Sequence, residues 1–324
     1  MNTKLSHITE PVDTELKEFR SFFKKTIASD VPLLDLFTNY LIKQKGKEIR
    51  PLLAVLSARL FGSINQRSMV AATMIELLHT ATLLHDDVVD NAHARRGMVS
   101  IHRIWNNKAA ILLGDFLLSK GLLIALENNE HTLLEVQSRA VKKMSEGELR
   151  QLKTAGLGNM TEDRYYQIIE EKTASLIATC CECGAVSTSS DEEIHKRMND
   201  VGYAIGMAFQ IKDDLLDYSE SEIGKPKRND IKERKITLPF IKAVQNATKS
   251  DARIYRRLMK KRKKTSRDIE DIVQFVRDNK GIEDSERIMH SYASKAQEEI
   301  RSLSSSEQRN SLIELIDFIV NRTK

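Results

Sequence analysis

Glycine, proline and cysteine are all scarce in this sequence. Of its 324 residues, 13 are glycine and 5 are proline, whereas average usage would give about 39 in total. A fold rich in β-strands needs these residues at its many turns, so their scarcity indicates long helices joined by few turns. Hydrophobic residues make up 41% and charged residues 30% of the chain. This balance is typical of a globular protein with a full core and excludes wholesale disorder.

The three cysteines form one cluster, Cys180, Cys181 and Cys183. An odd number with adjacent members makes a poor disulfide framework, and no second Cys or His pair completes a zinc site. We therefore expect the cysteines to be small buried residues on a helix, and we expect the protein to be in a reducing compartment, the cytoplasm. The net charge of +5 is too weak to indicate nucleic acid as a partner. We find no strictly apolar run of the roughly 18 residues that span a bilayer, and residues 1–11 resemble neither a signal peptide nor an anchor.

Apolar residues recur at helical spacing along almost the whole sequence. The predicted long helices cover residues 14–28, 30–44, 67–90, 106–127, 131–154, 161–189 and 192–218. The polar residues 219–233, with Gly224 and Pro226, predict a loop. No linker or repeat interrupts the pattern. We therefore expect one all-α domain over residues 1–324, a bundle of about 10 to 13 helices around a central cavity.

Two aspartate clusters share the spacing D-D-x-x-D. The first is Asp86, Asp87 and Asp90, and the second is Asp213, Asp214 and Asp217. On a helix, the first and last aspartates of each cluster lie one turn apart on the same face. Three carboxylates this close repel one another, and Mg²⁺ prefers carboxylate oxygen and commonly joins carboxylates to phosphate oxygens. Two such clusters therefore predict a magnesium site, whereas a single one would more simply be a set of exposed charges at a helix end.

Basic residues follow each cluster closely. Arg95 and Arg96 follow the first, and Lys225 and Lys235 follow the second. The cations Lys47, Arg50 and Lys172 add to this set. Since Arg matches phosphate oxygens in a bidentate manner, six acids and seven bases around one cavity predict a site for more than one diphosphate.

Several ordered blocks resemble the trans-polyprenyl diphosphate synthase family, including its medium- and long-chain members such as octaprenyl diphosphate synthase. They are residues 46–51, 79–90 and 95–97, Gly114-Asp115, Lys172-Thr173, residues 209–217, and residues 224–239. The resemblance implies the isoprenoid synthase fold. It also implies condensation of isopentenyl diphosphate with an allylic diphosphate such as farnesyl or geranylgeranyl diphosphate.

The resemblance assigns a role to each block. Asp86, Asp87, Asp90, Asp213 and Asp217, with Asp214 as a weaker ligand, would hold about three Mg²⁺ on the allylic diphosphate. Arg95, Lys172 and Lys225, assisted by Lys235, would bind the same diphosphate. Lys47, Arg50, His79 and Arg96 would bind isopentenyl diphosphate, while Thr173 and Gln210 would face the reacting carbons. Separately from the resemblance, we expect Arg322 and Lys324 to close over the diphosphates.

Two positions depart from the family pattern. Glu48 stands where an arginine is usual, which removes this position from a phosphate-binding role. Arg228 stands where a glycine is usual, so the loop either becomes stiffer or gains a cation near the diphosphate.

The predicted reaction is head-to-tail condensation. Electrostatic stabilisation of the departing diphosphate lets the allylic bond ionise, and the double bond of isopentenyl diphosphate attacks the cation. No protein nucleophile is needed. The released diphosphate is the predicted acceptor of the final proton.

Product length is predicted from the helix that precedes Asp86. The residues upstream on that face are Met74, Leu77, Leu78, Ala81 and Thr82. Small Ala81 and Thr82 would leave a tunnel open over about 18 Å. We therefore expect a product of roughly C30 to C50, with C40 as the best single value, for the side chain of a quinone. The alternative is that Ala81 and Thr82 only pack against a neighbouring helix.

Three other functions remain open. An HD-type metal phosphohydrolase uses His and Asp on helices but does not need the second cluster. A class I terpene cyclase does not need cations for a second diphosphate. A non-catalytic or partner-requiring subunit of a heteromeric synthase would typically lack some of these acids and bases. The family resemblance further implies a homodimer, and a buried helix face among residues 99–152 is a candidate interface. Because the product is insoluble in water and the surface is rich in Arg and Lys, we also expect at most transient contact with anionic lipid.

Overall fold

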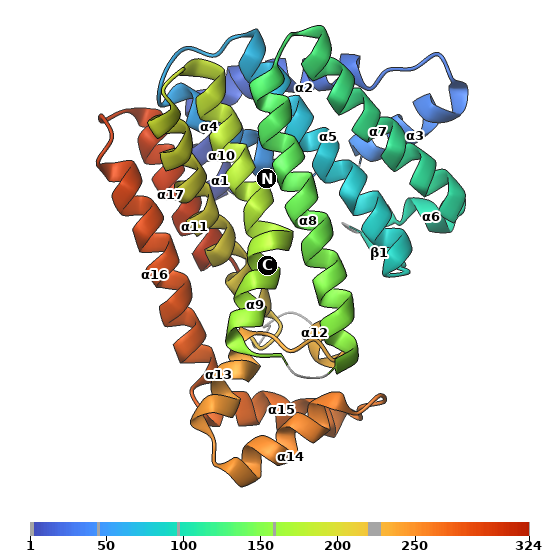
Figure 1. Ribbon diagram of the computed structural model, residues 1–324, viewed down its shortest axis with the longest axis vertical. Coiled ribbons are helices and arrows are strands. Elements are labelled where there is room, and N and C mark those ends of the chain that lie inside the picture. The colour runs from blue at the N-terminus through green and yellow to red at the C-terminus, as the bar shows by residue number, and fades with distance from the viewer. Residues whose placement is uncertain (1–2, 44–45, 96–97, 158–159, 220–227, 324) are drawn as a thin grey trace. The chain divides into compact units, whose positions relative to one another are not determined.

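A computed structural model describes residues 3–43, 46–95, 98–157, 160–219 and 228–323 (Figure 1). Over these residues the protein is almost entirely helical, in agreement with the predicted all-α fold. It divides into two compact units. Unit 1 comprises residues 1–139, 179–199 and 303–312, and unit 2 comprises residues 140–178, 200–302 and 313–324. The expectation of a single domain over residues 1–324 stays a prediction.

Unit 1 is built mainly from the N-terminal helices. These are α1 (Thr3–Thr9), the 3₁₀ turn η1 (Glu10–Val12), α2 (Asp13–Thr26), α3 (Pro32–Lys43), α4 (Ile49–Arg59), α5 (Gln66–Val89), α6 (Ile101–Ile104) and α7 (Asn107–Glu127). A short antiparallel hairpin, β1 (Ala94–Arg95) and β2 (Met98–Val99), was not predicted. Two residues per strand are too few for an alternating pattern to be recognised.

Unit 2 holds most of the C-terminal helices. They are α9 (Glu162–Ile169), the π-helical turn η2 (Glu170–Ala174), α12 (Asn229–Lys232), α13 (Leu238–Asn246), α14 (Lys249–Lys260), α15 (Ser266–Asp278) and α16 (Gly281–Arg301). Four helices contribute residues to both units: α8 (His131–Leu157), α10 (Ser175–Thr188), α11 (Glu192–Leu216) and α17 (Glu307–Asn321).

Helix α5 carries the first aspartate cluster. A capping box at its start satisfies two backbone donors, because the Asn65 side chain accepts from the Ser68 N–H at 3.1 Å while the Ser68 hydroxyl accepts from the Asn65 N–H. The helix continues without a break to Val89, and Asp90 caps its C-terminus. One uninterrupted helix therefore carries Asp86 and Asp87 in its last turn and Asp90 at its C-cap.

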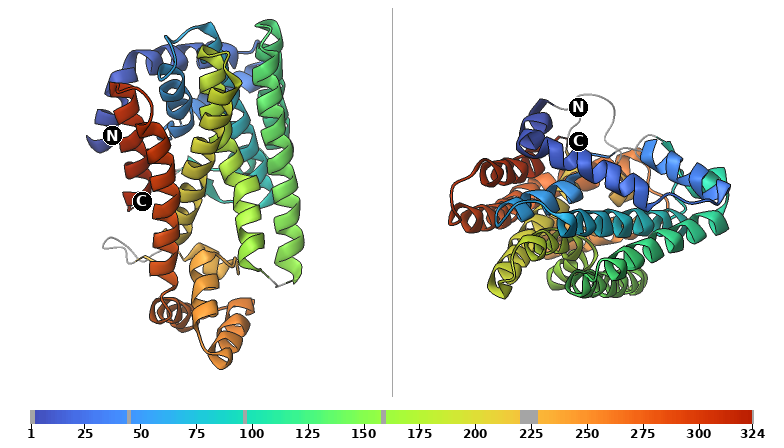
Figure 2. Two further views of the ribbon diagram at one scale, coloured as in Figure 1. Left: turned by 60° about the vertical axis from the view of Figure 1, so that its left-hand side comes forward. Right: turned by 90° about the horizontal axis from the view of Figure 1, so that it is seen from above.

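Helices α5 and α7 pack closely side by side (Figures 1 and 2). The core between them contains Leu77, Ala81 and Leu84 from α5 and Ala110, Leu113 and Leu117 from α7. A Cβ at Gly114 would lie 2.2 Å from Nε2 of His85, so a larger residue there would require the His85 ring to move. The same helix α7 is long and apolar enough, by length and composition, to cross a bilayer. We did not predict this, because Asp115 and Lys120 interrupt its apolar run.

Unit 2 has a separate apolar core around its C-terminal helices. Buried Tyr218, Phe240, Met259, Ile272 and Val276 belong to one cluster that joins the segment after α11 to α13, α14 and α15. Gly281 lets α16 begin directly against α13, since a Cβ at this position would lie 2.2 Å from the Pro239 carbonyl oxygen. The segment that follows the second aspartate cluster is thus anchored in this core.

Candidate active site

The first aspartate cluster lies at the C-terminal end of α5. Asp87 is buried, with 4% of its surface exposed, whereas Asp90 is exposed. The Asp90 N–H donates to the Asp86 carbonyl oxygen at 2.8 Å, so the last helical turn continues through the cluster. The carboxylates therefore range from buried Asp87 to exposed Asp90 within a single turn.

Two residues predicted to bind isopentenyl diphosphate are in contact. Nη1 of Arg50 donates to Nε2 of His79 at 2.9 Å, which requires this ring nitrogen to be unprotonated. His79 is buried, while Lys47 is exposed. Lys47 directly precedes Glu48, and Arg50 follows it by two residues. Glu48 is the N-cap of α4 and has a left-handed backbone with φ of 49°. The structure thus brings Arg50 from α4 to His79 on α5.

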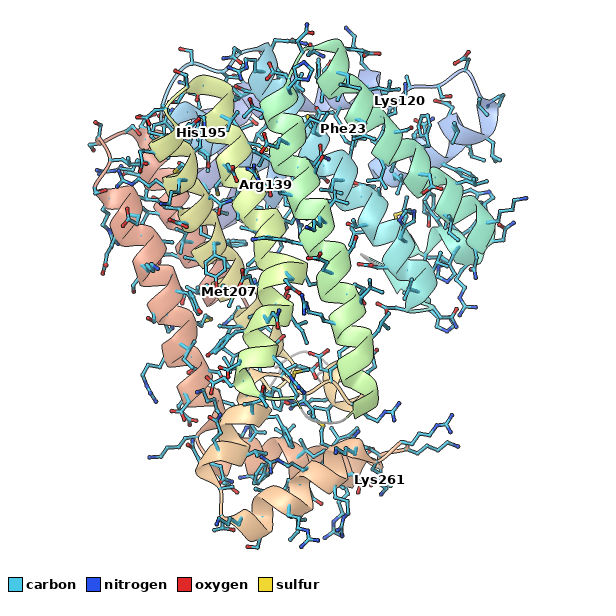
Figure 3. All side chains as sticks on the ribbon, viewed as in Figure 1. Phe23, Lys120, Arg139, His195, Met207 and Lys261 are labelled. Carbon is cyan, nitrogen blue, oxygen red and sulfur yellow. The ribbon has the colours of Figure 1, made fainter. Side chains whose placement is uncertain are left out.

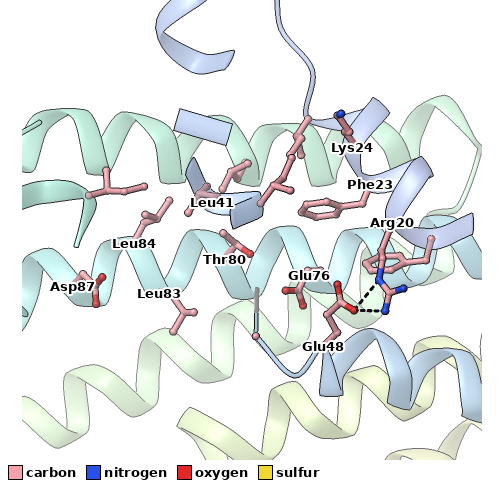
Figure 4. A pocket seen from close by; sticks show the side chains of 16 residues that line it. Arg20, Phe23, Lys24, Leu41, Glu48, Glu76, Thr80, Leu83, Leu84 and Asp87 are labelled. Carbon is pink, nitrogen blue, oxygen red and sulfur yellow. Dashed lines mark hydrogen bonds and ion pairs between the residues drawn. The ribbon is translucent and has the colours of Figure 1, made fainter. Parts of the chain in front are cut away.

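A cavity of about 230 Å³ lies along α5 within unit 1 (Figure 4). We call it the α5 cavity. Helix α5 contributes Glu76, Thr80, Leu83, Leu84 and Asp87 to its lining. The remaining lining residues are Phe19, Arg20, Phe23, Lys24, Ile27, Leu41, Ile42, Gly46, Glu48, Ile101 and Leu117.

The predicted chain-length residues do not line this cavity. Met74, Leu78 and Ala81 are fully buried on another face of α5, and Ala81 packs in the core against α7. The Thr82 hydroxyl donates to the His79 carbonyl oxygen at 2.9 Å. The cavity instead follows Thr80, Leu83 and Leu84, because a shift of one position on a helix turns the side chain by about 100°. The chain-length role of the four predicted residues stays a prediction.

The second aspartate cluster is surrounded by hydrogen-bond partners within unit 2. Nη2 of Arg322 donates to Oδ1 of Asp213 at 2.5 Å, and its guanidinium lies over the ring of Phe209 at 4.2 Å. Asp217 accepts from the N–H groups of Asn229 at 2.9 Å and Asp230 at 3.2 Å. These contacts fix the chain on either side of residues 220–227. That segment, which includes Lys225, lies outside the described part of the structure.

A chain of hydrogen bonds joins the predicted reaction residues to the second cluster. The Thr173 hydroxyl donates to Oε1 of Gln210 at 2.8 Å, and Nε2 of Gln210 donates to Oδ1 of Asp214 at 2.9 Å. The buried Tyr165 hydroxyl donates to Oδ2 of Asp214 at 2.6 Å. Burial raises the pKa of Asp214 to about 7, although both of these hydrogen bonds lower it. These hydrogen bonds orient the Gln210 amide, with its oxygen toward Thr173 and its nitrogen toward Asp214. Sequence reasoning missed Tyr165.

Lys172 and Thr173 lie in the π-helical turn η2. Nζ of Lys172 contacts Glu148 at 2.6 Å and Gln151 at 3.4 Å. Two glycines let neighbouring helices approach this turn: a Cβ on Gly147 would lie 2.7 Å from Cβ of Glu171, and one on Gly206 would lie 2.5 Å from Cα of Ala174. Helical turns of this kind are frequent at functional sites. Sequence reasoning found the lysine and threonine but missed the two glycines.

A second cavity, of about 610 Å³, lies in unit 2. We call it the Lys172 cavity. Five predicted site residues line it: Lys172, Thr173, Gln210, Asp214 and Lys235. Lys235 is exposed and paired with Asp230 and Glu233. The structure therefore gathers these five predicted site residues around a single cavity. Arg96 lies outside the described residues, as does the side chain of Arg95.

The arrangement of acids bears on metal binding. Within the described ranges, no three Asp, Glu, His or Cys side chains lie close enough to hold a metal ion by themselves. Mg²⁺ commonly takes only one or two carboxylates and completes its coordination with water and substrate phosphates. The chemistry of the donors in both clusters, which is carboxylate oxygen throughout, fits that kind of ion.

Comparison with known proteins places these features in a family. A polyprenyl synthetase family model matches residues 31–276. Heptaprenyl diphosphate synthase component 2 of Bacillus subtilis (strain 168) is 33% identical over 322 residues, which cover 98% of this chain and 89% of that protein. Octaprenyl diphosphate synthase of Haemophilus influenzae is 31% identical over 320 residues, covering 98% and 97%. The chain belongs to the polyprenyl synthetase family.

A solved structure agrees with this assignment. A polyprenyl synthase from Caulobacter crescentus CB15, complexed with calcium and isoprenyl diphosphate, matches with a TM-score of 0.90 and 33% identity. The match covers 99% of this chain and 98% of the other. The protein is thus a transferase of the trans-polyprenyl diphosphate synthase class with the isoprenoid synthase fold.

Proposed function

We propose that this protein condenses isopentenyl diphosphate with an allylic diphosphate, such as farnesyl or geranylgeranyl diphosphate, to give a long all-trans polyprenyl diphosphate. The hydrogen-bond chain from Thr173 through Gln210 to Asp214, which lines the Lys172 cavity, carries this proposal. It joins groups that can face a cation to a carboxylate of the second cluster. We propose a product of roughly C30 to C50, with about C40 as the best value, destined for a quinone side chain.

Both aspartate clusters and several basic residues would hold the allylic diphosphate. Asp86, Asp87, Asp90, Asp213 and Asp217, with Asp214 weaker, would bind about three Mg²⁺ together with diphosphate oxygens. When bound, these ions supply positive charge that stabilises the departing diphosphate. Lys172 supplies further positive charge from the wall of its cavity, and we assign Arg95, Lys225 and Lys235 to the same diphosphate.

The cation would be steadied by oxygen atoms that do not react with it. The Thr173 hydroxyl and the Gln210 amide are fixed relative to one another at 2.8 Å. A preorganised dipole stabilises developing charge without the cost of reorienting during the reaction. Isopentenyl diphosphate would be bound by Lys47, Arg50, His79 and Arg96. Its double bond attacks the allylic carbon, and the released diphosphate accepts the final proton.

The second candidate function is that of one subunit in a synthase that needs a different partner protein. The Bacillus subtilis relative is described as component 2 of its synthase, which favours a comparison with two-component enzymes. Against this, every acid and base assigned above is present in the sequence. We propose that the chain is active without a different partner protein.

We propose that the chain forms a homodimer through α7. Its exposed apolar residues include Leu112, Leu122, Leu123 and Leu126, which are 57%, 49%, 49% and 50% exposed. A row of exposed leucines of this kind marks an interface more often than a solvated surface. Sedimentation of the purified protein tests this, with Leu122→Glu expected to shift it toward the monomer.

We further propose a cytoplasmic location with transient membrane contact. The connection from α14 to α15, where Lys261 is labelled in Figure 3, holds five consecutive basic residues at positions 260–264. Such a cluster is attracted to anionic lipid by roughly 1 kcal/mol per charge near the surface. This attraction would bring a water-insoluble product to a bilayer.

The main experiment uses purified protein, Mg²⁺, farnesyl diphosphate and labelled isopentenyl diphosphate. Formation of a long polyprenyl diphosphate by this chain alone is the expected result. Product that appears only after addition of a second protein would instead support the component role. Release of phosphate alone, or formation of a cyclic hydrocarbon, would contradict the proposed reaction.

A further inference from the structure

Tyr165 donates a buried hydrogen bond to a carboxylate of the second aspartate cluster. Its hydroxyl lies 2.6 Å from Oδ2 of Asp214, and each of the two residues is only 4% exposed. A buried carboxylate that lacks donors is unfavourable, so this hydrogen bond stabilises the folded protein. A phenylalanine would fill nearly the same space, so packing alone does not account for the hydroxyl.

Asp214 is occupied on both of its oxygen atoms. Oδ1 accepts from Nε2 of Gln210 at 2.9 Å, while Oδ2 accepts from Tyr165. Gln210 lies one turn before Asp214 on α11, and Tyr165 comes from α9. All three residues belong to unit 2. A carboxylate oxygen that already holds a protein donor is less available to a metal ion, which agrees with the weaker place of Asp214 among the proposed ligands.

The carboxylate of Asp214 decides which way the Gln210 amide points. An ionised carboxylate only accepts hydrogen bonds, so the amide must turn its NH₂ group toward Asp214. Its carbonyl oxygen then faces Thr173, whose hydroxyl donates to it at 2.8 Å. Because the Thr173 proton is used in this hydrogen bond, the lone pairs of the Thr173 oxygen point away from Gln210.

The dipoles of Gln210 and Thr173 therefore share one direction, with their positive ends toward Asp214. Both residues line the Lys172 cavity, so two oxygen atoms lie at its wall. Hydrogen bonds in such a chain polarise one another. Dipoles that are fixed before the reaction stabilise a developing charge without the cost of reorienting.

We propose that Tyr165 is a positioning residue that acts through Asp214 and keeps the oxygen atoms of Gln210 and Thr173 turned toward the reacting carbons. This inference rests on the proposed function, to which it adds the residue that sets the direction of these two dipoles. Without the Tyr165 hydroxyl, Asp214 could rotate away from Gln210. The amide could then reverse and present its NH₂ group to the cation.

The test compares two adjacent tyrosines. Tyr165→Phe removes the hydroxyl that holds Asp214, whereas the matched control Tyr166→Phe removes a hydroxyl that donates to Glu162 at 3.0 Å. Tyr165→Phe is expected to lower kcat about tenfold to a hundredfold, the usual size when a group that orients another is lost. KM for both substrates should stay unchanged, because the dipoles act on charge that develops only in the transition state.

Tyr166→Phe is expected to keep the wild-type kcat. Equal kcat values for the two variants would overturn the inference. A rise in KM with unchanged kcat in Tyr165→Phe would also overturn it, because that result would show a role in substrate binding.

A second background shows whether Tyr165 acts through Gln210. In Gln210→Ala the amide is absent, so adding Tyr165→Phe is expected to cause no further loss of kcat. A loss as large as the one in the wild-type background would overturn the inference, because a general structural role of Tyr165 does not depend on Gln210.

Asp214→Asn serves if Tyr165→Phe does not fold. Asparagine has nearly the shape of aspartate but can present an NH₂ group to Gln210. We expect kcat to fall while the Mg²⁺ concentration that gives the half-maximal rate stays unchanged. A higher Mg²⁺ requirement with the wild-type kcat at saturating Mg²⁺ would show that Asp214 acts as a ligand and would overturn the inference.

Urea unfolding of the metal-free protein tests the hydrogen bond without the reaction. The urea midpoint is expected to be lower for Tyr165→Phe than for Tyr166→Phe, because one buried oxygen of Asp214 loses its donor. Equal midpoints would contradict the hydrogen bond on which the inference depends. Wild-type protein that makes no polyprenyl product would overturn the proposed function, whereas product made equally fast by wild type and Tyr165→Phe would overturn this inference alone.

Discussion

The two aspartate clusters share one spacing but have different surroundings. In the second cluster each carboxylate accepts a hydrogen bond from another segment: Asp213 from Arg322, Asp214 from Tyr165, and Asp217 from the backbone of residues 229–230. Asp214 also accepts from Gln210, one turn earlier on its own helix. In the first cluster the carboxylates differ in exposure at the end of one helix, since Asp87 is buried and Asp90 is exposed. The same motif thus occurs at two helix ends that differ in exposure and in the sequence distance of the described partners.

We expect the largest loss of activity when one carboxylate of either cluster is removed. Asp86→Asn and Asp213→Asn should each lower kcat about a hundredfold to a thousandfold, a size typical for loss of one group that stabilises developing charge. Asp30→Asn and Asp200→Asn, at exposed positions of the two units, are the controls. Initial rates at saturating Mg²⁺ measure the effect. A large loss in only one of the two cluster variants would show that the clusters are not equivalent in the reaction.

The pH dependence of stability should distinguish the second cluster. Burial raises the pKa of Asp214 to about 7 and that of Asp230 to about 6. A carboxyl group whose pKa is raised by folding stabilises the folded state below its unfolded pKa of about 4, and this contribution is lost as the pH rises through the folded value. The free energy of unfolding of the metal-free protein should therefore fall between pH 4 and pH 7, for Asp214 by on the order of 4 kcal/mol.

Urea unfolding at a series of pH values measures this fall. Asp214→Asn should flatten the profile, whereas Asp90→Asn, at the exposed end of the first cluster, should leave it unchanged. Equal profiles for wild type and Asp214→Asn would contradict the assignment of the pH effect to this carboxyl.

Two lysines on the wall of one cavity should differ in their effect. Lys172 is half-buried and lies in η2 beside Thr173, while Lys235 is exposed and paired with two acids. Lys172→Met should lower kcat/KM for the allylic diphosphate about a hundredfold, and Lys235→Met about tenfold or less. Steady-state kinetics with varied allylic substrate measure both. A larger loss at Lys235 would reverse their proposed ranking.

The smallest expected effect tests the packing of η2. Gly147→Ala should destabilise the protein by about 1 to 3 kcal/mol, because the added Cβ overlaps Glu171. At Gly121 the nearest atom to an added Cβ is 3.7 Å away. Gly121→Ala should be neutral or stabilising by up to about 1 kcal/mol, as expected for alanine in a helix. Denaturant unfolding compares the two, and equal stabilities would show that the turn can shift to accept the methyl group.

Helices with strong apolar periodicity could be predicted from the sequence, and their contacts could not. The predicted range 67–90 agrees closely with α5, and 106–127 with α7, because long apolar patterns leave few alternatives. The predicted helix 161–189 is divided by η2, since a turn with one extra residue leaves no signal in a period of 3.6. The predicted loop 219–233 contains α12, which is only four residues long.

The candidate site was predictable to the extent that it depends on charged residues in compact blocks. The aspartates, Lys172, Thr173 and Gln210 could be found in this way. Tyr165 and the two glycines beside η2 could not, because each acts through a contact with a residue far away in sequence. The face of α5 that borders the cavity was missed for the same reason: it is decided by α2 and α3, whose packing against α5 leaves no pattern in α5 itself.

The π-helical turn Glu170–Ala174 has a consequence for how the gene can change. The turn holds one residue more than regular helical geometry needs, so deletion of any one of its five residues would restore a continuous α-helix without breaking it. The cost would fall on direction rather than on helicity, because the side chains within the turn would be redirected while the helices on either side keep their phase. Lys172 and Thr173 would then no longer point in their present directions. Insertions and deletions should therefore be rejected in this segment even where substitutions are tolerated.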